Sequence, residues 1–125
     1  MIRIFKNSND GTLNKLKKIE PNCWIDLVEP SELEIKEVVE QTGVPANLLI
    51  KMLDTDETAR IEKEDDATLI VIDVPFVEDK KTKNKYSTLP LGIITYKNYL
   101  ITLSVKETEV LNDVMENRVK YVVTA

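Results

Sequence analysis

Residues 31–45 contain the signals that most constrain the fold of this chain: a helix start, a helix end and a second helix start in close succession. Ser31 and Glu34 have the S-x-x-E spacing of a capping box, in which each side chain accepts a hydrogen bond from the other residue's backbone N–H. Gly43 suits the left-handed conformation that ends many helices, and Pro45 suits the first turn of the next one. This segment therefore predicts two consecutive helices.

The apolar positions show which side of each helix is buried. The first helix has a stripe at the i, i+3, i+4, i+7 spacing, formed by Ile35, Val38, Val39 and Thr42. In the second helix we expect four side chains to pack inward: Leu48, Leu49, Met52 and Leu53. Both helices are amphipathic, so each needs a sheet to cover its apolar side.

Short apolar segments on both sides of the helices predict strands. Before the helices they lie at residues 1–5, 13–19 and 24–28, and after them at residues 60–63, 67–76, 86–96 and 99–105. Lys97 and Asn98 form a two-residue connection, which indicates a hairpin between the last two strands. Residues 69–74 are nearly all apolar, so we expect the strand there to be covered on both faces.

The order of these elements predicts the fold class. Residues 78–85 form a charged loop, and Thr108 is placed to cap a last helix with one apolar side, formed by Val110, Leu111, Val114 and Met115. Mixed connections, with helices between strands, predict an α/β fold: a three-layer α/β/α domain with a mixed, mostly antiparallel sheet of about six to seven strands and about three helices. A chain of 125 residues supports one domain, residues 1–125.

The rare residue types exclude several kinds of chemistry. The chain has no histidine and one cysteine, which excludes an internal disulfide, a Cys/His zinc site and imidazole catalysis. Cys23 precedes an apolar strand, and we interpret it as an inert core thiol. Asp26 and Asp73 lie within apolar strands, so we expect them at strand ends or paired, because an unpaired buried carboxylate is costly.

The localisation also follows from the apolar pattern. No apolar run approaches the roughly 20 residues that span a bilayer. Met1 begins a strand pattern instead of a signal peptide. We therefore expect a soluble, intracellular chain.

The net charge of −5 comes from one stretch, residues 54–66, which we call the acidic segment. It contains seven acids against Arg60 and Lys63, whereas the 15 acids and 15 bases elsewhere cancel. Such a segment repels phosphate backbones, and no basic stripe is present, so we expect no nucleic-acid partner. A divalent cation is the partner that this charge favours.

Several short patterns occur in an order that resembles one protein family. They are WIDL at residues 24–27, GVP at 43–45, LDTDE at 53–57 and RIE at 60–62, followed by strand patterns at 69–76, 91–93 and 97–102. Together they resemble the cytoplasmic N-terminal domain of the CorA-type magnesium and cobalt transporters. The resemblance covers nearly the whole chain, and its strength lies in the order and spacing of many weak patterns.

The resemblance implies a non-enzymatic domain on the cytoplasmic side of the cell membrane. In that family the domain is followed by a long stalk helix and two membrane helices with a Gly-Met-Asn motif, none of which this sequence contains. We therefore interpret the chain as a fragment of a transporter that reaches the membrane only through a missing C-terminal part. The resemblance further implies a homo-oligomer, a pentamer, in which magnesium between neighbouring cytoplasmic domains holds the transporter closed.

Asp54, Asp56 and Glu57 are the candidate metal ligands. Magnesium takes oxygen ligands, commonly one or two carboxylates and several waters, so acids on one turn could hold it between subunits. A solvated acidic loop is the alternative that this spacing leaves open. Where family members carry an acidic pair in the second helix this chain has Ile50 and Lys51, so we predict no metal site on that helix.

Lys51 itself has two interpretations. We favour an ordinary exposed lysine on the outer side of the second helix. The alternative is a fixed positive charge that replaces a metal and pairs with an acid of a neighbouring subunit.

Two further function classes stay open. Asp54, Asp56 and Thr58 match the D-x-D-x-T motif of haloacid dehalogenase-type phosphatases, in which the first Asp attacks phosphorus. That chemistry needs the motif at the end of a buried parallel strand, whereas the preceding residues have helical spacing. The other class is an assembly module that oligomerises without sensing a metal.

Overall fold

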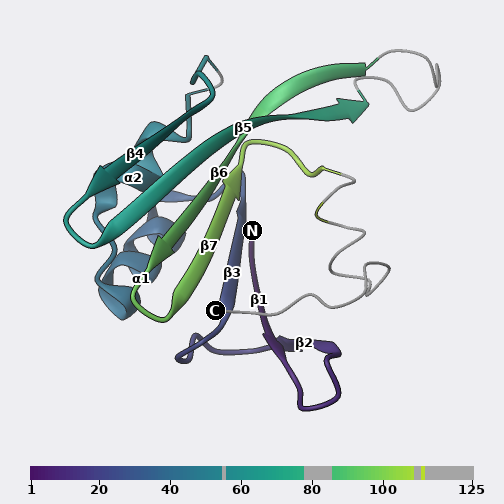
Figure 1. Cartoon of the computed structure of the whole chain (residues 1–125), viewed down its shortest axis with the longest axis vertical. Coiled ribbons are helices and arrows are strands. Elements are labelled where there is room, and N and C mark those ends of the chain that lie inside the picture. The colour runs from purple at the N-terminus through teal and green to yellow at the C-terminus, as the bar shows by residue number, and fades with distance from the viewer. Residues whose placement is uncertain (55, 78–85, 109–110, 112–125) are drawn as a thin grey trace.

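Seven strands and two helices follow one another in the part of the chain that the computed structural model describes, residues 1–54, 56–77, 86–108 and 111 (Figure 1). In order they are β1 (Ile2–Asn7), β2 (Leu13–Leu16), β3 (Trp24–Val28), α1 (Glu32–Thr42), α2 (Ala46–Lys51), β4 (Arg60–Glu64), β5 (Ala67–Val77), β6 (Tyr86–Tyr96) and β7 (Tyr99–Ser104).

All seven described strands form one sheet in the order β2-β1-β3-β7-β6-β5-β4. The central pair, β3 and β7, is parallel, and the other neighbours are antiparallel. The longest strands, β5 and β6, extend together beyond the rest of the sheet (Figure 1). The predicted α/β fold with a mixed, mostly antiparallel sheet is confirmed.

Both described helices lie on the same face of the sheet (Figure 1). The main core forms between them and the sheet, and includes Ile25 of β3, Ile101 of β7 and Leu48 of α2, each fully buried. Of the predicted third helix, the structure describes Leu111, which is buried against the other face of the sheet and whose N–H donates to Thr108 Oγ1 (3.4 Å). The rest of that helix, and the second helical layer it would form, lies outside the described residues.

The predicted signals at both ends of α1 are confirmed. The Glu34 N–H donates to Ser31 Oγ (3.2 Å), and the Ser31 N–H donates to Glu34 Oε1 (2.9 Å). At the other end Gly43 has a φ of 81°, and its N–H donates to the Val39 carbonyl. These contacts satisfy backbone groups that have no partner inside the helix.

Close packing holds α2 against β6. A Cβ added at Gly92 would lie 2.6 Å from Met52 Cγ, so only glycine lets the buried Met52 side chain approach this strand. Leu48, Leu49 and Met52 are buried as predicted, but Leu53 is 40% exposed. The prediction for Leu53 was wrong because α2 ends at Lys51, so Leu53 no longer follows the helical period.

The two tight hairpins have the expected backbone geometry. Lys97 and Asn98 connect β6 to β7, as predicted, with Tyr96 opposite Tyr99. Asp65 and its neighbour connect β4 to β5 in the same way. Lys97 and Asp65 have φ values of 51° and 52°, in the left-handed region that two-residue hairpin loops use.

The second face of the sheet has a smaller core around Phe5 and Trp24, whose ring centroids are 5.2 Å apart. This core does not extend over all of β5. Ile72, on this face, is 38% exposed. Asp73 points to the helix side and is also exposed, so the prediction that this strand is covered on both faces was wrong for the described residues. Asp73 lies inside the strand and, being solvated, needs no buried partner.

Candidate functional site

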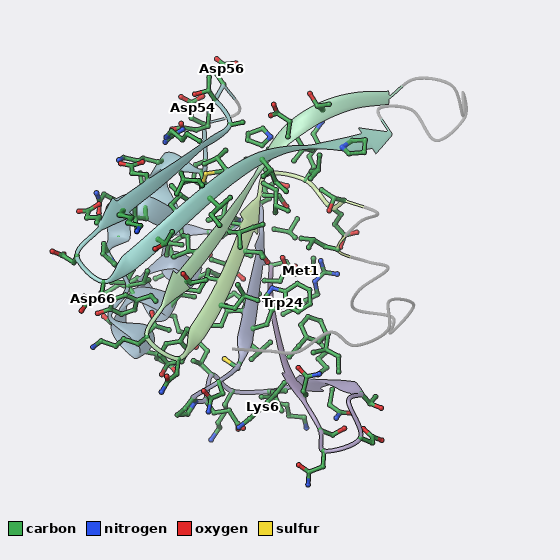
Figure 2. All side chains as sticks on the ribbon, in the orientation of Figure 1. Met1, Lys6, Trp24, Asp54, Asp56 and Asp66 are labelled. Atoms are coloured by element: carbon green, nitrogen blue, oxygen red, sulfur yellow. The ribbon has the colours of Figure 1, made fainter. Side chains whose placement is uncertain are left out.

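The acidic segment does not gather into one patch. Figure 2 shows Asp54 and Asp56 together near one end of β4, whereas Asp66 lies near the opposite end. Between these ends, β4 contributes Glu62 and Glu64. The acidic residues that are concentrated in one stretch of the sequence are therefore spread along the length of the edge strand β4.

Asp54 and Asp56 lie on a turn directly after α2. Asp54 Oδ1 accepts a hydrogen bond from the Asp56 N–H (2.9 Å), and the Asp54 N–H donates to the Lys51 carbonyl (3.2 Å). The first contact is the local side-chain bond that aspartates commonly make in turns. Because Asp54 follows a helix instead of a buried parallel strand, the geometry that the phosphatase alternative requires is not formed.

Glu57 contacts a base instead of the other two candidate ligands. The Arg60 guanidinium donates to Glu57 Oε2 (2.5 Å), to the Thr58 carbonyl (3.0 Å) and to Glu62 Oε2 (3.4 Å). The neighbouring carboxylates raise the pKa of Arg60, with the Glu57 hydrogen bond as the largest cause. Glu57 is thus charge-compensated within its own chain.

Two further side-chain contacts join α2 to β4. Lys51 Nζ donates to Glu62 Oε1 (2.6 Å), and Asn47 Nδ2 donates to Glu64 Oε2 (2.6 Å). The hydrogen bond from Lys51 lowers the pKa of Glu62 most, with a further contribution from Arg60. The favoured interpretation of Lys51 was incomplete, since this side chain is 37% exposed and pairs with an acid of its own chain.

The described side chains do not form a complete metal site. No three Asp, Glu or Cys residues in the described ranges are close enough together to hold an ion. Glu57 fits a magnesium ion poorly because Arg60 already occupies its carboxylate. Asp54, Asp56 and Glu57 as ligands therefore stay a prediction, in which water or a second subunit would have to supply the remaining oxygens.

A groove of about 550 Å³ lies between α1 and α2, close to the turn that carries Asp54. Its lining residues are Glu32, Ile35, Lys36, Val39, Glu40, Ala46, Ile50 and Leu53. Two of these apolar residues are exposed, Ile50 at 56% and Leu53 at 40%. The groove is thus an apolar surface with charged residues of α1 among those that line it.

The family model described as "CorA-like Mg2+ transporter protein" matches residues 20–120. The chain belongs to this family. No curated protein matches it.

Solved structures share the fold of this CorA-like chain. The complete CorA magnesium transporter from Methanocaldococcus jannaschii has a TM-score of 0.77 at 23% identity, and the match covers 94% of this chain and 36% of that one. The soluble domain of the same CorA has a TM-score of 0.77 at 22% identity, with coverage of 99% and 49%. The ZntB cytoplasmic domain from Vibrio parahaemolyticus has a TM-score of 0.68 at 13% identity, with coverage of 91% and 47%.

This CorA-like chain matches only part of each of these solved structures. It spans between about a third and a half of the length of the solved structures. None of the helices in the described ranges is long and apolar enough to cross a membrane.

The sequence reasoning missed most of a buried polar network in the CorA-like domain. Trp24 Nε1 donates to Thr102 Oγ1 (2.8 Å), whose hydroxyl donates to Asp26 Oδ1 (2.7 Å). Arg3 donates to Asp26 Oδ2 (2.8 Å) and also pairs with Glu107 (3.2 Å). The predicted pairing of Asp26 is confirmed, but its partners come from sequence-distant strands and no local pattern identifies them.

Proposed function

We propose that this chain is a cytoplasmic domain of a divalent-cation transporter, with magnesium or cobalt as the transported ion. The family match over residues 20–120 carries the proposal, and the fold shared with the M. jannaschii CorA soluble domain over 99% of the chain supports it. On this proposal the ion path lies outside these residues, and the domain has no catalytic role.

The first test is to read the gene beyond codon 125. The proposal predicts a long charged helix followed by two apolar segments of about 20 residues, which is the length that spans a bilayer. A Gly-Met-Asn motif should follow the first of these segments. A stop codon directly after Ala125 would contradict the proposal.

The domain would also assemble with copies of itself. The groove between α1 and α2 supports this role, because exposed apolar surface such as Ile50 and Leu53 marks interaction sites. We assign the groove to a second copy of the chain. In a closed ring of more than two subunits, the groove of one subunit meets a different surface of the next subunit, so each subunit offers one groove and covers one groove.

Assembly can be tested with the full-length protein and two matched substitutions. Ile50→Glu places a charge beside the groove, whereas Leu33→Glu places one on α1 at a side chain that is 77% exposed and does not line it. We expect Ile50→Glu to lower the molar mass measured by light scattering in detergent, and Leu33→Glu to leave it unchanged. Equal masses for Ile50→Glu and the wild type would contradict the assigned surface.

The regulatory magnesium would bind at the turn that carries Asp54 and Asp56, together with groups from a neighbouring subunit. The small number of carboxylates that magnesium requires supports this assignment. In the full-length protein, Asp54→Asn with Asp56→Asn should weaken the inhibition of ion uptake by magnesium on the cytoplasmic side. Unchanged inhibition would instead favour an assembly module that senses no metal through this turn.

A further inference from the structure

The junction between α2 and β4 brings carboxylates and tethered cations together. Lys51 is the last residue of α2, and its Nζ lies 2.6 Å from Glu62 Oε1 on β4. The other carboxylate oxygen, Glu62 Oε2, lies 3.4 Å from the Arg60 guanidinium. Each oxygen of Glu62 therefore has its own cationic partner.

Arg60 extends this arrangement to a second acid. Its guanidinium bridges Glu62 and Glu57, so Lys51, Glu62, Arg60 and Glu57 alternate in sign and sum to zero. We call these four side chains the junction ion pairs. Their side chains are between 17% and 37% exposed, so solvent and salt screen them less than pairs on an open surface.

A divalent cation would meet competition at this junction. Magnesium needs carboxylate oxygens that are free of other positive charges, but Lys51 and Arg60 already contact both oxygens of Glu62. An ion placed there would have to displace an ammonium group and would be repelled by the guanidinium. The family's magnesium therefore does not fit the residues of this junction.

We propose that Lys51 and Arg60 act as built-in counter-ions, which take the place of a divalent cation where α2 meets β4. This inference concerns regulation and rests on the proposed transporter function for its physiological meaning. The position of α2 on the edge strand would then be independent of magnesium concentration. Any magnesium response of the domain would have to arise outside the junction ion pairs.

Thermal unfolding of the 125-residue chain at increasing MgCl₂ and constant ionic strength tests the proposal. Lys51→Glu places a carboxylate opposite Glu62, so the variant should unfold at a lower temperature in EDTA than the wild type. Magnesium should then bridge the two acids and stabilise the folded state by mass action. We expect the Tm of Lys51→Glu to rise with magnesium by about 3 °C more than the wild-type Tm.

Lys15→Glu is the matched control. Lys15 lies on β2, at the opposite edge of the sheet from β4, and its side chain is exposed. The substitution changes the charge by the same amount but removes no contact at the junction. Its Tm should respond to magnesium as the wild-type Tm does.

Two results would overturn the proposal. One is a folded Lys51→Glu variant whose Tm responds to magnesium no more than that of Lys15→Glu. The other needs no Lys51 variant: a magnesium-dependent rise in the wild-type Tm that Glu62→Gln abolishes would place the ion at the junction despite Lys51. Neither result depends on the gene beyond codon 125. The counter-ion proposal can therefore fail while the transporter function stands, and the two failures are distinguishable.

Discussion

Asp26 is the fully buried charged side chain among the described residues. Burial raises the pKa of this carboxyl group, whereas the hydrogen bonds from Thr102 and Arg3 act in the opposite direction. These bonds connect β1, β3 and β7 at the centre of the sheet. A single carboxylate thus joins the parallel strand pair to its antiparallel neighbour.

Removing this carboxylate should be costly. Asp26→Ala leaves Arg3, whose side chain is 16% exposed, without its buried partner, and breaking such a pair costs about 3 kcal/mol of unfolding free energy. Glu20→Ala is the control, because it breaks the exposed Lys6–Glu20 pair and should cost less than about 1 kcal/mol. Urea unfolding measures both. Similar losses for the two variants would refute a structural role for Asp26.

The Glu62 ion pairs predict a specific dependence of stability on pH. Lys51 lowers the pKa of Glu62 below its usual value of 4.5, so the folded state favours the ionised form. The stabilisation is therefore complete above the unfolded-state pKa and is lost as the pH falls through the folded-state pKa. Urea unfolding at about pH 6 and about pH 3 should show a smaller loss of stability in Glu62→Gln than in the wild type. An equal loss would contradict this role of the pair.

At the scale of elements, the position of α2 depends on one glycine. In Gly92→Ala the new Cβ would overlap Met52, which is fully buried and cannot move into solvent. We expect a loss of about 1–3 kcal/mol in urea unfolding, as for other overpacked cores. With Met52→Ala already present, Gly92→Ala should cost clearly less. Equal costs in the two backgrounds would show that Met52 is not the obstacle.

The helices and hairpins were predictable because their signals are local. The capping box at Ser31, the αL residue Gly43 and the Lys97–Asn98 connection each depend on a few consecutive residues. The exposure of Leu53 and Ile72 was not predictable in this way. It depends on where α2 ends and on how far the second core extends over β5.

Only the concentration of acidic residues at the candidate site was predictable from the sequence. The sequence shows the acids of residues 54–66, but it does not show that Arg60 compensates Glu57 or that Lys51 reaches Glu62. The Lys51–Glu62 pair forms because α2 packs beside the edge strand β4, which is a property of the tertiary fold, whereas the Arg60–Glu57 pair is a local contact three residues apart. Acidic residues that are close in sequence therefore lie in two different places. Asp54 and Asp56 lie on a turn, whereas Glu57 and Glu62 belong to the junction ion pairs.

At the scale of the whole molecule, the groove and the acidic turn are neighbours. Ile50 and Leu53 line the groove, and Asp54 follows directly in the chain. A second copy bound at the groove would lie beside Asp54 and Asp56. Assembly and a magnesium response at the turn would then be coupled, because each changes the free energy of the other.

Divalent-cation uptake by liposomes that contain the full-length protein encoded by this gene tests the proposed transporter function. We expect magnesium or cobalt to enter these liposomes faster than it enters liposomes prepared with residues 1–125 alone, which on this proposal contribute no ion path. Correctly inserted, folded full-length protein that takes up neither ion would contradict it.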